Sequence, residues 1–264
     1  MPSPRVSAVL NAVVAVAVIG WNYWTAINGL DGRTVGGMSD RYDTLFTPAG
    51  YAFSIWGIIF LGLLVNAGYQ LWLAFTDREP DLFRRLGPWL ILTNLANGLW
   101  VYLWLTEQTA ASVLVLASMF VFTQIAMVRL DMEVWDAPTR IIAFVWWPIV
   151  VYAGWITVAV LANLSAYLAK EGWVSGTSEG WAIAMIALAT IVNLGLVYKR
   201  NLREHAGVAI WAFVAIAVRQ WDQVASVQWT AVGAAGLLVL VTAAHAFQNR
   251  ATLPFLRRAR AEER

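Results

Sequence analysis

The sequence predicts an all-α integral membrane protein with about eight transmembrane helices. Three observations carry the prediction: 60% of the 264 residues are hydrophobic, only 13% are charged, and the charged residues lie between long apolar segments. Soluble globular chains carry about 25% charged residues, and disordered chains are poor in hydrophobic ones. The composition therefore excludes both classes. The chain also has no cysteine, which excludes thiolate metal sites, iron–sulfur clusters and a cysteine nucleophile.

Each predicted helix is a segment long enough to cross a bilayer core of about 30 Å, which needs about 20 residues. The eight segments are 7–27, 50–75, 88–106, 109–128, 141–169, 181–198, 206–222 and 226–247. None of the first six contains Asp, Glu, Lys or Arg, as burial in lipid requires. The seventh segment is the weakest prediction, because Arg219 and Asp222 lie at its end. These two residues either pair with each other at the water boundary or lie inside the bundle.

The first segment follows Arg5, as the apolar part of a signal peptide would, but no small-residue cleavage site comes after it. Trp21, Tyr23 and Trp24 are instead typical of a helix end anchored at the membrane interface. The eighth segment contains Gly233 and Gly236, small residues that permit close helix contact. We expect that contact within the chain, with a homodimer as the alternative.

The basic residues divide unequally between the two ends of the predicted bundle. Fourteen of the 18 Lys and Arg residues lie at one end, together with both termini, and four lie at the other, namely Arg33, Arg41, Lys170 and Arg219. The positive-inside rule then places both termini in the cytoplasm, which requires an even number of spans. The expected location is a bacterial inner (plasma) membrane.

Two segments carry a stripe of polar and aromatic side chains on one helical face. The stripes are Thr93, Asn97, Trp100 and Trp104 in the third segment, and Tyr152, Trp155, Ala159 and Asn163 in the fifth. An asparagine facing lipid has no water partner, so each stripe should face protein. Hydrogen bonding between helices is one interpretation. Two such stripes in one bundle favour a ligand pocket with aromatic walls.

These residues resemble the TspO/MBR family, the tryptophan-rich sensory proteins and translocator proteins. The fifth segment keeps Tyr, Trp, Ala and Asn at the spacing of the family pattern Pro-Tyr-x-x-Trp-x-x-Phe-Ala-x-x-Leu-Asn, and Asn97-x-x-Trp100 is similar to its third-helix pattern. Residues 47–60 resemble the start of its second helix, with one residue fewer before Trp56, and residues 41–48 resemble its loop motif. Val151 replaces the family proline.

The motifs divide the chain into residues 1–170, a TspO-like five-helix bundle, residues 171–248, three additional helices, and residues 249–264, a basic cytoplasmic tail. The resemblance implies a pocket for a flat hydrophobic molecule, such as a tetrapyrrole, a sterol-like lipid or an isoprenoid, beneath the loop 28–47. Carried over residue by residue, the pocket is lined by Trp56, Asn97, Trp100, Tyr152, Trp155 and Asn163, with Tyr42, Phe46 and Phe53 near its mouth. Family members are sensors, transporters or porphyrin-degrading proteins.

An intramembrane enzyme acting on an isoprenoid or tetrapyrrole is the alternative. Two acidic clusters could hold magnesium and a diphosphate, but arginines are interleaved with their members Asp77, Glu79, Asp81, Asp131, Glu133 and Asp136. His205 and His245 could meet as a haem or metal site, although such residues are more often wet or capping groups, so no metal site is assigned. The expected partners are membrane lipid and a hydrophobic small molecule, and no nucleic acid is expected to bind. The candidate cofactor is a bound tetrapyrrole or lipid.

Overall fold

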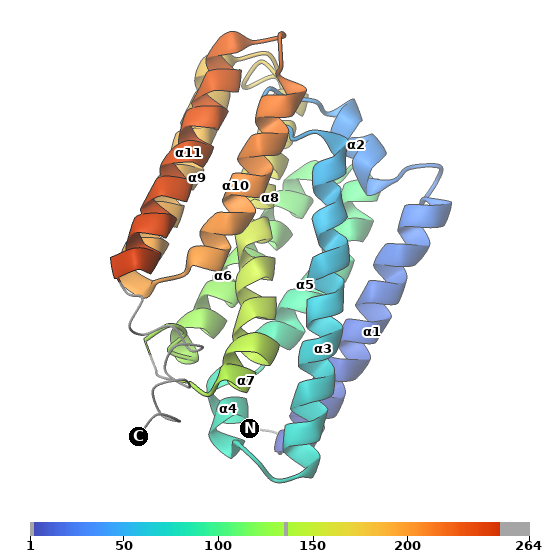
Figure 1. The fold of residues 1–264 in the computed structure, drawn as a ribbon. Helices are drawn as coiled ribbons and strands as arrows, with labels where there is room; N and C mark the ends of the chain where they lie inside the picture. The colour runs from blue at the N-terminus through green and yellow to red at the C-terminus, as the bar shows by residue number, and fades with distance from the viewer. Residues whose placement is uncertain (1–2, 135–136, 249–264) are drawn as a thin grey trace.

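A computed structural model describes residues 3–134 and 137–248, and in these ranges the chain forms helices and no strand (Figure 1). Each of the eight predicted segments coincides with one long helix. They are α1 (Pro4–Asn28), α3 (Ile55–Phe75), α5 (Trp89–Leu105), α6 (Thr109–Arg129), α8 (Trp147–Lys170), α9 (Glu179–Arg200), α10 (Arg203–Arg219) and α11 (Ala225–Gln248). The short elements are α2 (Val35–Arg41), η1 (Gly50–Ser54), α4 (Pro80–Leu86), α7 (Thr139–Ile141) and the π-helical η2 (Ile142–Trp146).

The all-α membrane fold is confirmed. Among the described residues, six helices are long and apolar enough to cross a membrane, and they include all the long helices except α5 and α10. Those two have 17 residues each, which is at the short end of the range of about 17–25 residues that a span needs. The count of eight spans therefore stays a prediction.

Local sequence fixes where the long helices begin and end. Ser3 caps α1 by accepting from the backbone N–H of Val6, and Ser178 caps α9 through Trp181 in the same way. The α1 helix ends at Gly29, whose φ of 71° falls in the left-handed region that favours glycine. These capping residues lie near the predicted segment boundaries, so the connecting loops fall at the two ends of the bundle.

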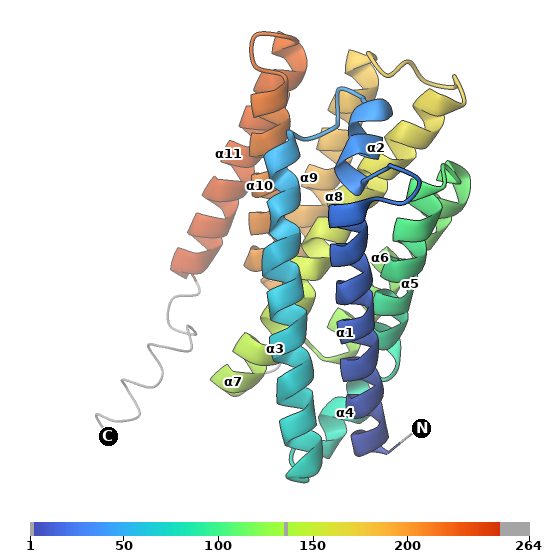
Figure 2. The same cartoon turned by 90° about the vertical axis from the view of Figure 1, so that its right-hand side faces the viewer.

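The bundle is continuous from α1 to α11. Helix α8 packs against α6 on one side and α10 on the other, and α10 in turn packs against α9 and α11 (Figures 1 and 2). Gly154 allows the close approach of α8 to α10, because a Cβ there would lie 2.9 Å from the Val208 Cβ and 3.0 Å from the His205 carbonyl oxygen. The three C-terminal helices therefore dock on the preceding helices mainly through the packing of α10 on α8.

His205 is fully buried between α8, α9 and α10, and not at a wet boundary as expected from the sequence. Its Nδ1 lies 2.7 Å from the Asn193 Oδ1, and its Nε2 lies 3.2 Å from the Thr157 Oγ1. Both ring nitrogens are thus engaged by the protein. Among the described residues no group of three histidines and acids could hold a metal ion, and the arrangement around His205 is that of a packing residue.

Candidate functional site

An aromatic cluster occupies the space where η1, α3, α5 and α8 meet. The Trp56 ring stacks near Trp100, with centroids 6.4 Å apart, and meets Trp155 edge-on at 6.3 Å. Phe53 meets Trp155 edge-on at 5.9 Å. Offset-stacked and edge-to-face pairs are the favourable aromatic geometries, so these four rings form a rigid wall.

A pocket lies beside this wall, with about 550 Å³ of space including its opening to solvent. Its other lining residues come from α8, from the segment between α1 and α3, and, with Trp104, from α5. The full lining is Val35, Ser39, Tyr42, Thr47, Pro48, Phe53, Trp56, Trp100, Trp104, Trp155, Val158, Ala159, Ala162, Asn163 and Ala166. The three alanines follow one face of α8, and their small side chains leave the room that larger residues would fill. The lining is mostly apolar, as in small-molecule sites.

Six of the nine residues assigned to a site from the sequence line this one pocket. They are Tyr42, Phe53, Trp56, Trp100, Trp155 and Asn163. Tyr152 lies behind the wall, with its ring 6.1 Å from Trp56. Phe46 is fully buried in the core. The Asn97 Oδ1 accepts from the Asn22 Nδ2 at 2.7 Å, a hydrogen bond between α5 and α1.

Asn163 fits both interpretations of the polar stripes, since it forms a hydrogen bond between helices and also lines the pocket. Its Oδ1 accepts from the Ser112 hydroxyl at 2.9 Å, which joins α8 to α6, and the residue also lines the pocket. Asn163 is therefore held in place by a neighbouring helix while it borders the cavity.

The segment between α1 and η1, residues 29–49, forms a lid that carries α2 and lies at the upper end of the bundle (Figure 2). Five of its residues line the pocket, namely Val35, Ser39, Tyr42, Thr47 and Pro48. The Trp104 Nε1 donates to the Val35 carbonyl at 3.3 Å, and the Tyr42 ring lies 6.0 Å from Trp104. The lid thus packs directly on α5.

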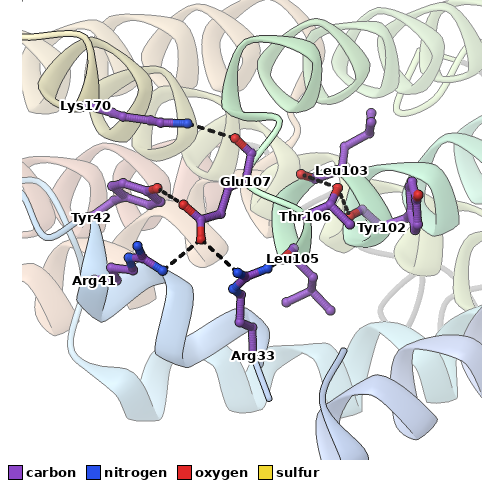
Figure 3. A network of polar contacts seen from close by, with 9 residues as sticks. All are labelled: Arg33, Arg41, Tyr42, Tyr102, Leu103, Leu105, Thr106, Glu107 and Lys170. Atoms are coloured by element: carbon purple, nitrogen blue, oxygen red, sulfur yellow. Dashed lines mark hydrogen bonds and ion pairs between the residues drawn. The ribbon is translucent and has the colours of Figure 1, made fainter. Parts of the chain in front are cut away.

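Glu107, in the turn between α5 and α6, clamps one side of this lid (Figure 3). Its carboxylate accepts from the Tyr42 hydroxyl at 2.7 Å, from the Arg41 guanidinium at 2.8 Å and from the Arg33 guanidinium at 3.2 Å. Lys170, at the end of α8, donates to the Glu107 carbonyl at 2.8 Å. One turn therefore gathers three lid residues and the end of α8.

The electrostatics of this clamp favour its charged form. The hydrogen bond from Tyr42 lowers the pKa of Glu107, and the neighbouring arginines lower it further. Burial raises the pKa of Tyr42, and the contact with Glu107 raises it again. The carboxylate is thus ionised and the phenol protonated at neutral pH, which is the combination that the hydrogen bond requires.

The opposite side of the lid is held by α10. Arg219 pairs with Asp40 at 3.2 Å and with Asp43 at 3.1 Å, rather than with Asp222. The Trp211 Nε1 donates to the Ala52 carbonyl at 3.1 Å, where η1 leads into α3. The C-terminal helices therefore take part in closing the pocket.

Comparison of the chain with known proteins identifies its family. The model of the TSPO-like protein family matches residues 8–244. The chain belongs to the TSPO-like family. No curated protein and no solved structure matches the chain. The family match confirms the resemblance expected from the motifs, and it extends through α9, α10 and α11, beyond the residues in which the motifs occur.

The loops of this TSPO-like protein group by end as the sequence indicated. The four basic residues of the predicted outer end, Arg33, Arg41, Lys170 and Arg219, all lie around the lid. At the other end, Arg5 pairs with Asp77 at 3.0 Å and Arg85 pairs with Asp131 at 3.0 Å. The segregation of the loops is therefore seen in the structure, whereas the assignment of one end to the cytoplasm stays a prediction.

The two acidic clusters of the TSPO-like chain are divided among arginine partners. Asp77 and Asp131 pair as described above, Asp81 pairs with Arg84 at 2.9 Å, and Glu79 lies 3.8 Å from Arg140. The Asn201 Nδ2 donates to Glu133 at 2.9 Å. Asp136 lies outside the described residues. These contacts are those of an ion-paired surface, and none of them brings the carboxylates together.

Some features of the site were not found from the sequence. Glu107 is a single acid in a three-residue turn, and its only signal is that the facing loop carries two arginines. Ala162 and Ala166 lie one and two turns after Ala159 on the same face of α8, but alanine gives no chemical signal in the sequence. Trp104 was recognised as part of a stripe and now lines the pocket.

Proposed function

We propose that this TSPO-like membrane protein is a receptor, sensor or carrier that binds a hydrophobic planar ligand in the aromatic pocket beneath the lid. The ligand classes that fit are tetrapyrroles, sterol-like molecules and isoprenoids. The observation that carries the proposal is one cavity lined both by the rings of Phe53, Trp56, Trp100 and Trp155 and by the small residues of α8.

Physical chemistry supports a flat apolar ligand. The rings offer broad apolar faces on which a planar molecule stacks. Polar residues also line the cavity, namely Ser39, Tyr42, Thr47 and Asn163, and such groups provide orientation for a polar edge of the ligand. The lid shields the ligand from water, which strengthens apolar binding because more apolar surface leaves water.

The test uses protoporphyrin IX as a probe and follows quenching of tryptophan fluorescence in detergent. Trp155→Ala and Trp100→Ala each remove a wall ring, and we expect each to weaken binding by about tenfold or more, since one buried aromatic contact is worth about 1–2 kcal/mol. Trp229→Ala is the matched control, because Trp229 lies on α11 and is 61% exposed. Unchanged affinity in both wall variants would remove the pocket assignment.

The alternative of an intramembrane enzyme is less favoured, because three of the acidic residues that it requires, Asp77, Asp81 and Asp131, are paired with arginines. We also propose the orientation predicted from the basic residues, with both termini in the cytoplasm of a bacterial cell, and the division of the chain at residue 170. Cysteines introduced at Ser3 and Gly172, which lie at opposite ends of the bundle, test the orientation by labelling intact cells with a thiol reagent that does not cross membranes. Labelling of Gly172→Cys alone is expected, and labelling of Ser3→Cys alone would reverse it.

A further inference from the structure

A second cavity lies between α1, α3, α4 and α5, at the end of the bundle away from the lid. It is lined by Ser7, Asn11, Gln70, Phe83, Leu86, Gly87, Leu90 and Ile91. The cavity has about 210 Å³ of space including its opening to solvent, which leaves room for a water molecule. It shares no lining residue with the aromatic pocket.

Asn11 points to a ligand in this cavity. The residue is 2% exposed, and neither its Nδ2 nor its Oδ1 has a hydrogen-bond partner among the described residues. It lies seven residues after Pro4, about 10 Å along α1, where lipid outside the bundle offers no hydrogen bonds. An amide with both groups unsatisfied at this depth is strongly unfavourable.

Gln70, on α3, is a second polar residue that lines this cavity. It is 1% exposed, and its Nε2 donates to the Asn66 Oδ1 at 2.7 Å. Asn66 in turn donates through Nδ2 to the Phe144 carbonyl at 2.9 Å. That carbonyl lies four residues before Pro148, which has no N–H to offer it. The chain of amides therefore holds the Gln70 side chain through one Nε2 hydrogen, and neither of these bonds uses its Oε1.

We propose that this cavity is a binding site for one water molecule, which accepts from the Asn11 Nδ2 and donates to the Gln70 Oε1. Ser7 adds a hydroxyl to the same lining. A water with two or more polar partners in a cavity of this size is an integral part of a structure. The site joins α1 to α3 through solvent, and it does not depend on whether the aromatic pocket binds a ligand.

Asn94 provides a matched control for the test. It is also a buried asparagine, 2% exposed, and its Nδ2 has no partner among the described residues, but it does not line the cavity. Leucine has the same branched arrangement of side-chain heavy atoms as asparagine, a larger volume and no polar group. Replacing Asn11 by leucine removes the hydrogen bonds to the bound water, whereas replacing Asn94 by leucine removes a donor that has no partner among the described residues.

The experiment compares thermal unfolding of the full-length protein in mild detergent. We expect Asn11→Leu to lower the Tm by several degrees and Asn94→Leu to lower it less or to raise it. An Asn11→Leu protein as stable as the wild type would overturn the proposal. If the variant does not fold, an experimental map of the wild type that resolves water decides the question. Density within hydrogen-bond distance of both Asn11 Nδ2 and Gln70 Oε1 supports the site, and a dry cavity refutes it.

Discussion

Replacing Tyr42 by phenylalanine should loosen the lid without changing its packing. The variant keeps the ring, which lies 6.0 Å from Trp104, and removes only the hydroxyl that donates to Glu107 at 2.7 Å. A hydrogen bond to a charged acceptor is stronger than a neutral one, but solvent weakens it at a half-exposed site such as this. We therefore expect the open fraction of the lid to rise by about three- to tenfold.

Limited proteolysis measures this opening without any ligand. Trypsin cleaves after Arg33 and Arg41, and both guanidinium groups are bound to Glu107 while the lid is closed. When opening is fast relative to cleavage, the cleavage rate follows the open fraction. Mass spectrometry of the fragments that end at these two residues should show about three- to tenfold faster cleavage in Tyr42→Phe.

Tyr102→Phe is the control for this experiment, because Tyr102 is 47% exposed on α5 and its hydroxyl takes part in none of the hydrogen bonds found between described residues. Its cleavage rate should equal that of the wild type. Equal rates in Tyr42→Phe and the wild type would refute the clamp, as would an equal increase in the two variants.

Three further predictions concern the second anchor of the lid, the docking of α10 and the other end of the bundle. Arg219→Gln removes the pairing with Asp40 and Asp43, so the same tryptic cleavage should accelerate, and its effect should multiply with that of Tyr42→Phe because the two anchors are separate. Gly154→Ala places a Cβ 2.9 Å from Val208 and should destabilise the fold by about 1–3 kcal/mol, seen as a lower Tm, whereas Gly207→Ala, which meets nothing within 4 Å, should not. Burial, and then the Glu204 charge, raise the pKa of Glu133 from 4.5 to about 7; folding therefore favours the protonated acid, and stability declines as pH rises from 4.5 to about 7 and stays lower above it. Glu133→Gln should remove this decline, which Tm values at about pH 5 and 8 would detect, and an equal decline in the variant would show that other groups cause it.

The membrane helices could be predicted because their signals are local. Length, apolar character and the exclusion of charge act within each segment, so all eight segments coincide with helices. The faces of α5 and α8 that meet the pocket were also predictable, since residues at i, i+3 or i+4, and i+7 share one side of a helix. The partners of those faces depend on tertiary packing, and so Asn97 is found bonded to Asn22 rather than lining the pocket.

Other features required the folded chain. His205 was expected at a boundary because it stands beside charged residues, but packing of α10 between α8 and α9 buries it against Asn193. Glu107 gives no pattern at all in a short turn, yet it joins the lid to α5, α6 and α8. The TSPO-like match through residue 244 likewise exceeds the reach of the motifs, which are found only in the first five segments.

The central claim is that the cavity beneath the lid holds a hydrophobic planar molecule. The most direct test is purification in mild detergent, followed by extraction and mass spectrometry of the small molecules that remain bound, for the wild type and for Ala162→Phe. Ala162 lines the cavity, and phenylalanine there would occupy the space next to the aromatic wall. We expect the wild type to retain a planar hydrophobic molecule in stoichiometric amount and the variant to lose it. A wild type that retains no such molecule, or a variant that retains it in equal amount, would contradict the account.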